Sequence, residues 1–423
     1  MSGVTSGTPA HCPLLVGRTR GKNRAASFVL DTSILATLLA ASSAPTPLYP
    51  LYQEQCSLSA LAVTVVFART HWRCCGLCLP PERSPTTWAG APSWRAPSSR
   101  RPPPWSSFLA SADSAGSLTA ARLLQGVATG AATSAAGAAL LDLENPRHPG
   151  RSALANTIAP VAGMAAGVLL SILLVRFAPA PTVTVYVLLA VLFAAQAIAV
   201  VFTTETAHRH TGALRSLRPH LGIPPGARRT LLSTGTAVVA VWALGGFYSS
   251  LGPALVRLVA PGAPQAARGM VFFPLSATAA LTVWALRRAE PLATATGGCL
   301  TVLPAAALTL SGLHGAGLPA VYGGAALAGA AFGAVSQGVL RLLLAPLDEW
   351  DRAATLVAYY VLSYLSMSLP AVAAGAATQR YGLGATSHAY AAIAALLAAA
   401  ALTALAVSRR RTATARPATD HLR

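Results

Sequence analysis

Residues 118–143, LTAARLLQGVATGAATSAAGAALLDL, form an apolar stretch that is long enough to cross a lipid bilayer as a helix. The stretch is rich in glycine and alanine, yet its first half carries Arg122. A cation is costly in hydrocarbon, so a membrane helix keeps one only where it faces protein or a water-filled cavity. We therefore expect Arg122 to face the interior of a helical bundle.

Four residues of this stretch recur at every fourth position, which places them along one slowly drifting face of a helix. They are Leu118, Arg122, Gly126 and Gly130. Glycines with this spacing allow a second membrane helix to approach closely. The pattern predicts that the charged face of the helix also packs inside the protein.

The composition of the 423-residue chain is that of an integral membrane protein. Hydrophobic residues make up 54% of it and charged residues only 10%, whereas about a quarter of the residues in a soluble domain are charged. The formal net charge is +19, but the arginines occur in short groups between apolar stretches, as in the cytoplasmic loops of membrane proteins. Since no soluble domain is expected to present a basic surface, we expect no nucleic-acid partner.

Ten apolar stretches have the length and hydropathy of membrane helices. They are residues 27–49, 118–143, 152–175, 183–202, 231–256, 270–286, 293–313, 318–344, 354–377 and 385–407. Basic residues concentrate at the N-terminus, in alternate connections and in the C-terminal tail, which predicts that both termini are cytoplasmic. Asp31 within the first stretch, and the many stretches that follow, indicate an uncleaved first helix rather than a signal peptide.

At Leu118, Arg122, Gly126 and Gly130 the chain resembles the major facilitator superfamily of secondary transporters, whose fourth membrane helix carries this pattern. The resemblance implies an all-α integral membrane fold with two pseudo-symmetric halves of six helices. It also implies that Arg122 faces a central cavity and takes part in proton coupling.

A second, weaker similarity lies in the next apolar stretch. Pro160, Gly163 and Gly167 are similar to a motif of the family's fifth helix that is associated with proton-linked antiporters, although Ala159 and Met164 replace two of its glycines. Ordinary packing of small residues explains the same positions. The motif therefore favours export over uptake without deciding between them.

The resemblance divides the chain into five parts. They are an N-terminal cytoplasmic tail (1–26), an N-terminal helical half (27–202), a central cytoplasmic linker (203–230), a C-terminal helical half (231–407) and a basic cytoplasmic tail (408–423).

Residues 69–104 do not fit this organisation, because they hold three tryptophans and many prolines without helical or strand periodicity. In the superfamily this position holds the end of the second helix, a G-x-L-x-D-x-x-G-R-R/K loop and the start of the third helix. A shifted reading frame with GC-rich codons can restore such a loop from residues 84–95, so we interpret the stretch as the product of two compensating frameshifts. The alternatives are a proline-rich loop or a metal site at Cys74, Cys75 and Cys78, but no partner ligands follow at a suitable spacing.

Asp31 and Arg122 are the candidates for proton coupling. Asp31 lies about four residues, or roughly 6 Å, inside the first stretch, where a carboxylate needs a partner, a proton or water. Alternatively, its side chain extends back to the cytoplasmic interface. Arg122 enters from the opposite side, at a level more than roughly 10 Å away along the membrane normal. We therefore expect coupling through water or conformational change rather than a direct ion pair.

Six polar or aromatic side chains could line a cavity near the membrane midplane. They are Gln125, Asn156, Trp242, Tyr248, Gln337 and Tyr360. Each could instead serve helix packing or an interfacial belt. Together they favour an amphipathic or aromatic substrate over a highly charged one, since we expect no second cluster of buried charge.

These features predict a secondary active transporter of the plasma membrane that works by alternating access. We expect proton-coupled export of a small amphipathic molecule by a monomer in the lipid bilayer, with no cofactor and no metal ion. The alternatives are an inactive relic of such a transporter, because of residues 69–104, and an uptake permease. A membrane-embedded enzyme ranks last, because the sequence shows no nucleophile with a partnered base and no acidic cluster.

Overall fold

The computed structural model describes residues 13–48, 51, 151–202, 225–345, 347 and 349–414, together with parts of 125–143. Within these residues every regular element is a helix. Leu118, Arg122 and the anomalous stretch 69–104 lie outside the described residues.

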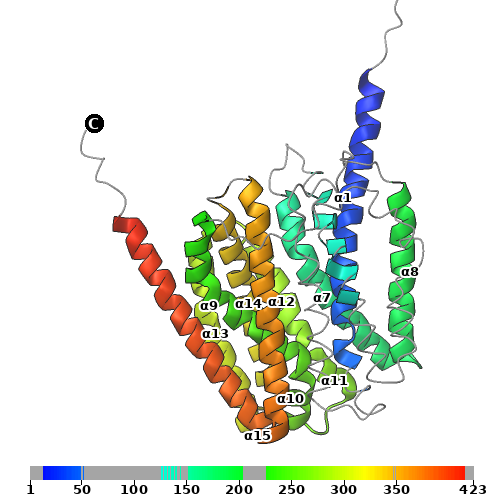
Figure 1. The fold of residues 1–423 in the computed structure, drawn as a ribbon. Helices are drawn as coiled ribbons and strands as arrows, with labels where there is room; N and C mark the ends of the chain where they lie inside the picture. Colours follow the sequence, from blue (N-terminus) through cyan, green and yellow to red (C-terminus); the bar gives the residue numbers. More distant parts are fainter. Residues whose placement is uncertain are drawn as a thin grey trace, which may run out of the picture.

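The described N-terminal half contains three long helices and one short turn of 3-10 helix. They are α1 (Pro13–Ser43), η1 (Thr46–Leu48), α7 (Arg151–Phe177) and α8 (Pro181–Val201). α8 begins with a proline at its first position, where the missing amide hydrogen costs no hydrogen bond. α1 begins at Pro13, so residues 13–26, which we expected to be a tail, continue the first helix (Figure 1).

The C-terminal half is described almost throughout. Its elements are α9 (Pro225–Ser250), α10 (Gly252–Val259), α11 (Gln265–Met270), α12 (Phe272–Ala285), α13 (Pro291–Ser311), η5 (Gly312–Ala316), α14 (Gly317–Leu344) and α15 (Glu349–Thr414). Residues 225–230, which we expected in the linker, form the first turns of α9. α13 starts where the Glu290 carboxylate accepts hydrogen bonds from the backbone amides of Leu292 and Ala293, which caps the helix.

Two long helical segments reverse direction at glycines with positive φ. Pro291–Leu344 contains Gly315 and Gly317, with φ angles of 105° and 71°. α15 contains Gly382, with φ of 80° and ψ of 161°. Glycine adopts these angles without the steric penalty of a Cβ atom. Each segment is therefore a hairpin of two membrane helices, one formed by α13 and α14 and the other by the two arms of α15.

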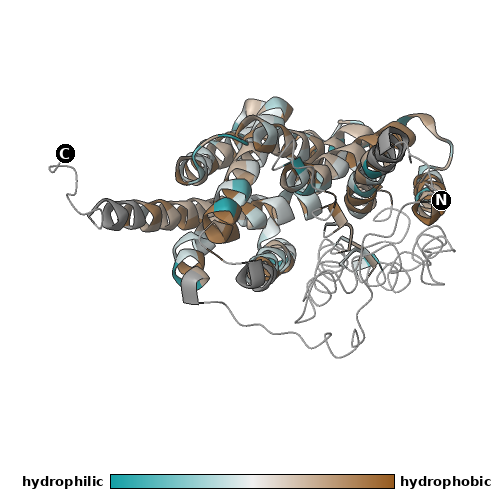
Figure 2. Ribbon diagram, turned by 90° about the horizontal axis from the view of Figure 1, so that it is seen from above, coloured by the Kyte–Doolittle hydropathy of each residue, from teal (hydrophilic) through white to brown (hydrophobic). Residues whose placement is uncertain are grey.

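The structure is that of a multi-pass membrane protein. Seven described segments are long and apolar enough to span a membrane, and the two hairpins among them are 54 and 50 residues long. Each hairpin crosses twice, so the described residues hold nine crossings, one for each predicted stretch other than 118–143. The most exposed parts of these helices carry large apolar side chains, such as Val191 at 62% and Leu396 at 70% exposure, and hydrophobic residues occur on nearly all helices (Figure 2). Such surfaces suit lipid rather than water.

Small residues bring pairs of helices into backbone contact. A Cβ atom on Gly163 or Gly167 of α7 would collide with the carbonyl oxygens of Ala36 and Ala40 on α1. The small-residue face predicted for 152–175 therefore packs on the first helix. In the other half, a Cβ atom on Gly246 of α9 would collide with a backbone carbonyl of α15. In each half, α1 or α9 thus meets another helix of the same half, α7 or α15, through glycine.

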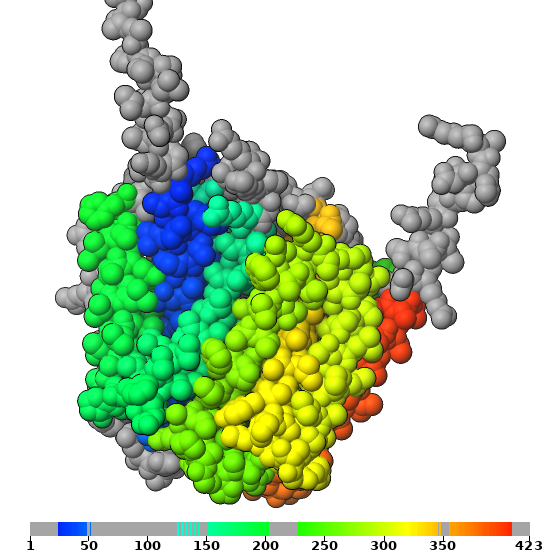
Figure 3. Space-filling model, turned by 180° about the vertical axis from the view of Figure 1, so that it is seen from behind, coloured from blue at the N-terminus to red at the C-terminus, as the bar shows by residue number. Residues whose placement is uncertain are grey.

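The two halves join along α7 and α12, which lie side by side in Figure 3. Met164, Val168 and Ile172 of α7 belong to or pack against the same hydrophobic core as Phe272 and Leu275 of α12. Met164 lies at the midpoint of α7, and Val168 and Ile172 lie in the half that is farther from its start at Arg151. The first turn of α1 and the end of α15 lie at the opposite end of the molecule from that half of α7 (Figure 1). We call that end the terminal face.

Candidate functional site

Polar side chains of the N-terminal half gather around α1. The Gln196 side chain of α8 donates hydrogen bonds to Ser33 Oγ at 3.2 Å and Thr37 Oγ1 at 2.9 Å. Ser43 Oγ donates to the Met164 carbonyl of α7 at 2.8 Å. Because hydrocarbon offers no other partners, these bonds fix α1 against its neighbours.

Two of the six predicted cavity residues also bond to neighbouring backbone. Gln125 is fully buried and its Nε2 atom donates to the Ala41 carbonyl of α1 at 2.8 Å. Asn156 of α7 donates through Nδ2 to the Gly137 carbonyl at 2.9 Å. These amides therefore tie residues 125–143 to α1 and α7, and a role in substrate binding stays a prediction.

Asp31 lies on the first membrane helix with only 8% of its surface exposed. It is seven residues beyond Arg24, where the membrane-spanning segment of α1 begins, which corresponds to a depth of about 10 Å. Within the described part of the chain, no hydrogen bond or ion pair to its carboxylate is found. A carboxylate at this depth requires a proton, water or a cation. Asp31 is therefore a buried acidic group, and its role in proton coupling stays a prediction.

The fourth-helix pattern is described only in its second half. Gly126 and Gly130 are buried, whereas Arg122 and Leu118 lie outside the described residues. Gln125, one turn after Arg122 in the sequence, bonds near the end of α1 that is opposite the terminal face. Asp31 precedes that contact by ten residues, about 15 Å of helix.

An aromatic cluster joins three helices of the C-terminal half. The ring centroid of Trp242 on α9 lies 5.0 Å from that of Phe332 on α14 and 5.8 Å from that of Tyr364 on α15. Tyr360 stacks on Tyr364 at 6.1 Å, one turn earlier in α15. The four rings are partly exposed and lie near the middle of their helices. Such rings can bind the apolar or cationic part of a ligand.

The remaining two predicted cavity residues lie elsewhere in this half. Tyr248 is 2% exposed, and its hydroxyl bonds to Thr309 of α13, so it lies within the packing of the helical half. Gln337 of α14 is 6% exposed, and its Oε1 atom has no hydrogen-bond partner within the residues that the structure describes. A buried amide oxygen without a partner is costly, and a role of Gln337 in substrate binding stays a prediction.

Sequence reasoning missed Phe332, Tyr364 and Gln196. Tyr364 follows Tyr360 by four residues, so the two share one helix face, which could have identified it. Gln196 is an isolated amide within an otherwise apolar stretch, and such residues in a membrane helix seek a polar partner. Phe332 carries no comparable signal.

The face opposite the terminal face is closed by a contact between the halves. η1, at the end of the first membrane helix, packs against α11, and all three of its residues are buried. A Cβ atom on Gly269 would lie 2.6 Å from Pro47 Cβ. Tyr322 of α14 donates its hydroxyl to the Ala267 carbonyl at 2.6 Å, which holds α11 in place. Pro47 and Gly269 therefore meet backbone to side chain, with no room for a larger residue.

No group of three or more histidine, cysteine or acidic residues that could hold a metal ion occurs within the described residues.

The comparisons with known proteins found similarity in structure but no match to a protein-family model or a curated protein. A bacterial homologue of the human lysosomal transporter Spinster, in an inward-facing and unoccupied conformation, is similar with a TM-score of 0.67 and 14% identity, over 92% of this chain and 98% of that one. The nucleoside transporter NupG is similar with a TM-score of 0.64 and 11% identity, over 90% and 98% of the two chains. The human organic anion transporter MFSD10 is similar with a TM-score of 0.61 and 17% identity, over 90% of this chain and 99% of that one.

These structures are matched over almost their full length, although fewer than a fifth of the residues are identical. Their likeness agrees with an all-α fold of two helical halves. The chain therefore has the fold of the major facilitator superfamily.

Proposed function

We propose that the protein is a secondary active transporter that exports a small amphipathic molecule in exchange for protons. The observation that carries the proposal is the contact between the halves: α7 packs on α12, and η1 on α11, toward the face opposite the chain termini. Two bundles that join on one side can rock about that contact, as alternating access requires. The likeness to an inward-facing Spinster homologue supports a state that is open toward the terminal face.

The aromatic cluster is the proposed substrate site. Trp242, Phe332, Tyr360 and Tyr364 offer ring faces from three helices. These ring faces suit a molecule with an apolar or cationic body. The described part of the cluster contains no charged side chain, which favours an amphipathic substrate over a polyanion.

Asp31 and Arg122 are the proposed coupling residues. Asp31 is buried in the first membrane helix, and Arg122 lies in an apolar stretch where its charge is costly. Binding and release of a proton at Asp31 would change the charge within the N-terminal half and so favour one orientation of the two halves.

A transport assay tests the proposal. The full chain, and a variant in which residues 69–104 are replaced by the frame-restored sequence, are reconstituted into vesicles that contain a pH-sensitive dye. Under an imposed pH gradient, amphipathic organic cations should cause proton movement in the frame-restored variant. Arg122→Ala and Asp31→Asn in that variant should abolish it, whereas Tyr381→Phe, at an exposed position of α15, should not. Proton movement that is unchanged in both coupling variants would contradict the proposed roles.

Inactivity of the chain itself is the second candidate, and residues 69–104 favour it, because they replace the loop between the second and third helices of the family. The same assay distinguishes an active transporter from an inactive relic. If the chain is a relic, the unaltered protein should show no flux and the frame-restored variant should show flux. Absence of flux in both proteins, across neutral and cationic amphipathic compounds, would count against a transporter. Net inward movement of substrate in the active variant would identify an uptake permease.

A further inference from the structure

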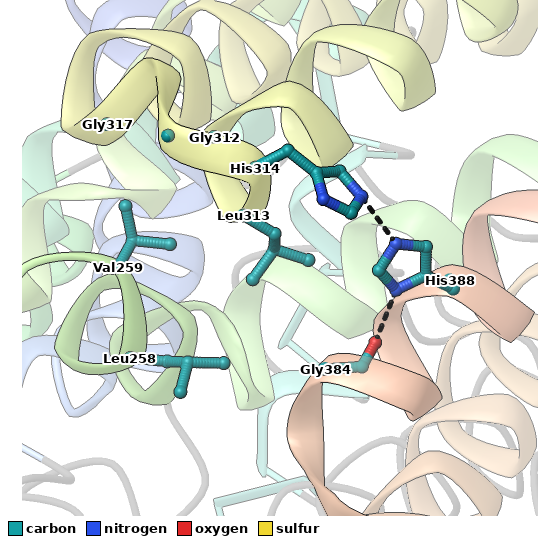
Figure 4. A pocket seen from close by; sticks show the side chains of 9 residues that line it. Leu258, Val259, Gly312, Leu313, His314, Gly317, Gly384 and His388 are labelled. Carbon is teal, nitrogen blue, oxygen red and sulfur yellow. Dashed lines mark hydrogen bonds between the residues drawn. The ribbon is translucent and has the colours of Figure 1, made fainter.

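Two histidines that are far apart in the sequence meet at the face opposite the chain termini. His314 lies in η5, between α13 and α14, and His388 lies in α15 just after the bend at Gly382. Their Nε2 atoms are 2.9 Å apart, although 74 positions separate them in the chain. Both residues are exposed, and their rings face each other at the edge of the cavity (Figure 4).

The backbone orients the His388 imidazole and sets the turn on which His314 lies. His314 has non-helical angles, φ −101° and ψ 24°, and the next residue, Gly315, has a positive φ. His388 Nδ1 lies 2.8 Å from the Gly384 carbonyl oxygen, one helical turn earlier. Because a carbonyl oxygen can only accept, Nδ1 carries the hydrogen, and the Nε2 atom of neutral His388 presents its lone pair to His314.

This arrangement is that of metal-binding histidines. A ligating histidine commonly donates its second ring N–H to a backbone carbonyl, which fixes the ring and raises its basicity. With metal–nitrogen bonds of about 2.05 Å, two nitrogen ligands lie about 2.9 Å apart at a right angle and about 3.3 Å apart at the tetrahedral angle. The two Nε2 atoms are 2.9 Å apart, so they need to move apart by at most a few tenths of an ångström to bind one metal ion.

We propose that His314 and His388 bind a divalent transition-metal ion through their Nε2 atoms, and that the hydrogen which His314 Nε2 donates to His388 moves to His314 Nδ1 when the ion binds. Two neutral imidazoles without a carboxylate favour Zn²⁺, Cu²⁺ or Ni²⁺ over Mg²⁺, Ca²⁺ and Mn²⁺, which prefer oxygen ligands. A cavity of about 400 Å³ adjoins the pair, and the two histidines are the polar side chains that line it; the other lining residues are Leu258, Val259, Gly312, Leu313, Gly315, Gly317 and Gly384. The cavity has room for water molecules that complete the coordination.

A bound ion would join two connections of the C-terminal half and lie beside a third. Leu258 and Val259, which line the cavity, belong to the end of α10, His314 to the turn between α13 and α14, and His388 to the bend of α15. We therefore expect the ion to stabilise this half against unfolding. The site lies apart from the aromatic cluster, so the inference does not depend on the proposed transport activity.

Thermal unfolding of the purified full chain in detergent, after removal of metals with a chelator, tests the site. Zn²⁺ at a concentration well above the dissociation constant should raise the unfolding midpoint, whereas Mg²⁺ at the same concentration should not. His314→Gln and His388→Gln keep a polar side chain that can hydrogen bond but remove a ligand. Loss of even an outer-shell partner weakens metal sites by about 10- to 100-fold, so each variant should weaken Zn²⁺ binding by at least about 100-fold.

A matched control is the double variant His208→Gln and His210→Gln, which removes two histidines close together in the linker. It should keep the full response to Zn²⁺. The electron paramagnetic resonance spectrum of bound Cu²⁺ should show nitrogen ligands in the unaltered chain and lose this signature in His388→Gln. A Zn²⁺ response that persists in His314→Gln and His388→Gln, or no response in the unaltered chain, would overturn the proposal.

Discussion

Gly163 sets the distance between α7 and α1, because any side chain at this position would collide with the Ala36 carbonyl oxygen. We expect Gly163→Ala to destabilise the protein by about 1 to 3 kcal/mol, the usual cost of overpacking, although alanine is the better helix former. Gly297→Ala in α13 is the matched control, because nothing lies within 4 Å of its added Cβ atom. Unfolding midpoints in detergent compare the two, and equal midpoints would show that α1 and α7 separate easily.

At the scale of one element, α15 depends on Gly382 for its reversal. Its φ of 80° and ψ of 161° lie in a region that is essentially restricted to glycine. Gly382→Ala should lower stability by about 1 to 3 kcal/mol, whereas Gly384→Ala, which meets no atom within 4 Å and has no positive φ, should be neutral. Thermal unfolding of the two variants measures the difference. A neutral Gly382→Ala would mean that the two arms of α15 are not held by this turn.

At the scale of the whole molecule, Pro47 and Gly269 report whether the two halves are in contact. Gly269→Trp cannot fit beside Pro47, so it should shift the population toward states in which this face is open. Thr46, which is 2% exposed, then becomes reachable. A Thr46→Cys probe, in a background whose six native cysteines are replaced by serine, should react with a maleimide about tenfold faster if the tryptophan costs the closed state about 1.4 kcal/mol.

Gly262→Trp is the control for this experiment, because a Cβ atom at position 262 meets nothing within 4 Å. It should leave the reaction rate of the probe unchanged. A fast reaction of the Thr46→Cys probe without the tryptophan would show that the face is open in the resting protein.

Much of this fold could be predicted from the sequence because hydropathy and glycine spacing act locally. The stretch 318–344 corresponds to α14, Gly317–Leu344, and the small-residue face of 152–175 does pack on α1. The candidate site was less predictable. Which side chains meet depends on the rotation and crossing of helices that are distant in the chain, as for Trp242 with Phe332 and His314 with His388. Hydropathy does not encode these angles.

The glycine contacts determine which parts of the protein can move. Where Gly163 and Gly167 lie against the carbonyl oxygens of α1, a slide by one residue would drive a side chain into backbone, so the two helices are locked in register. The seam between α7 and α12 is made of side chains instead, and side chains can repack. In the proposed transport cycle, we therefore expect motion at that seam while each half turns as a rigid body. A compound wedged into the seam would stop the motion without occupying the aromatic cluster.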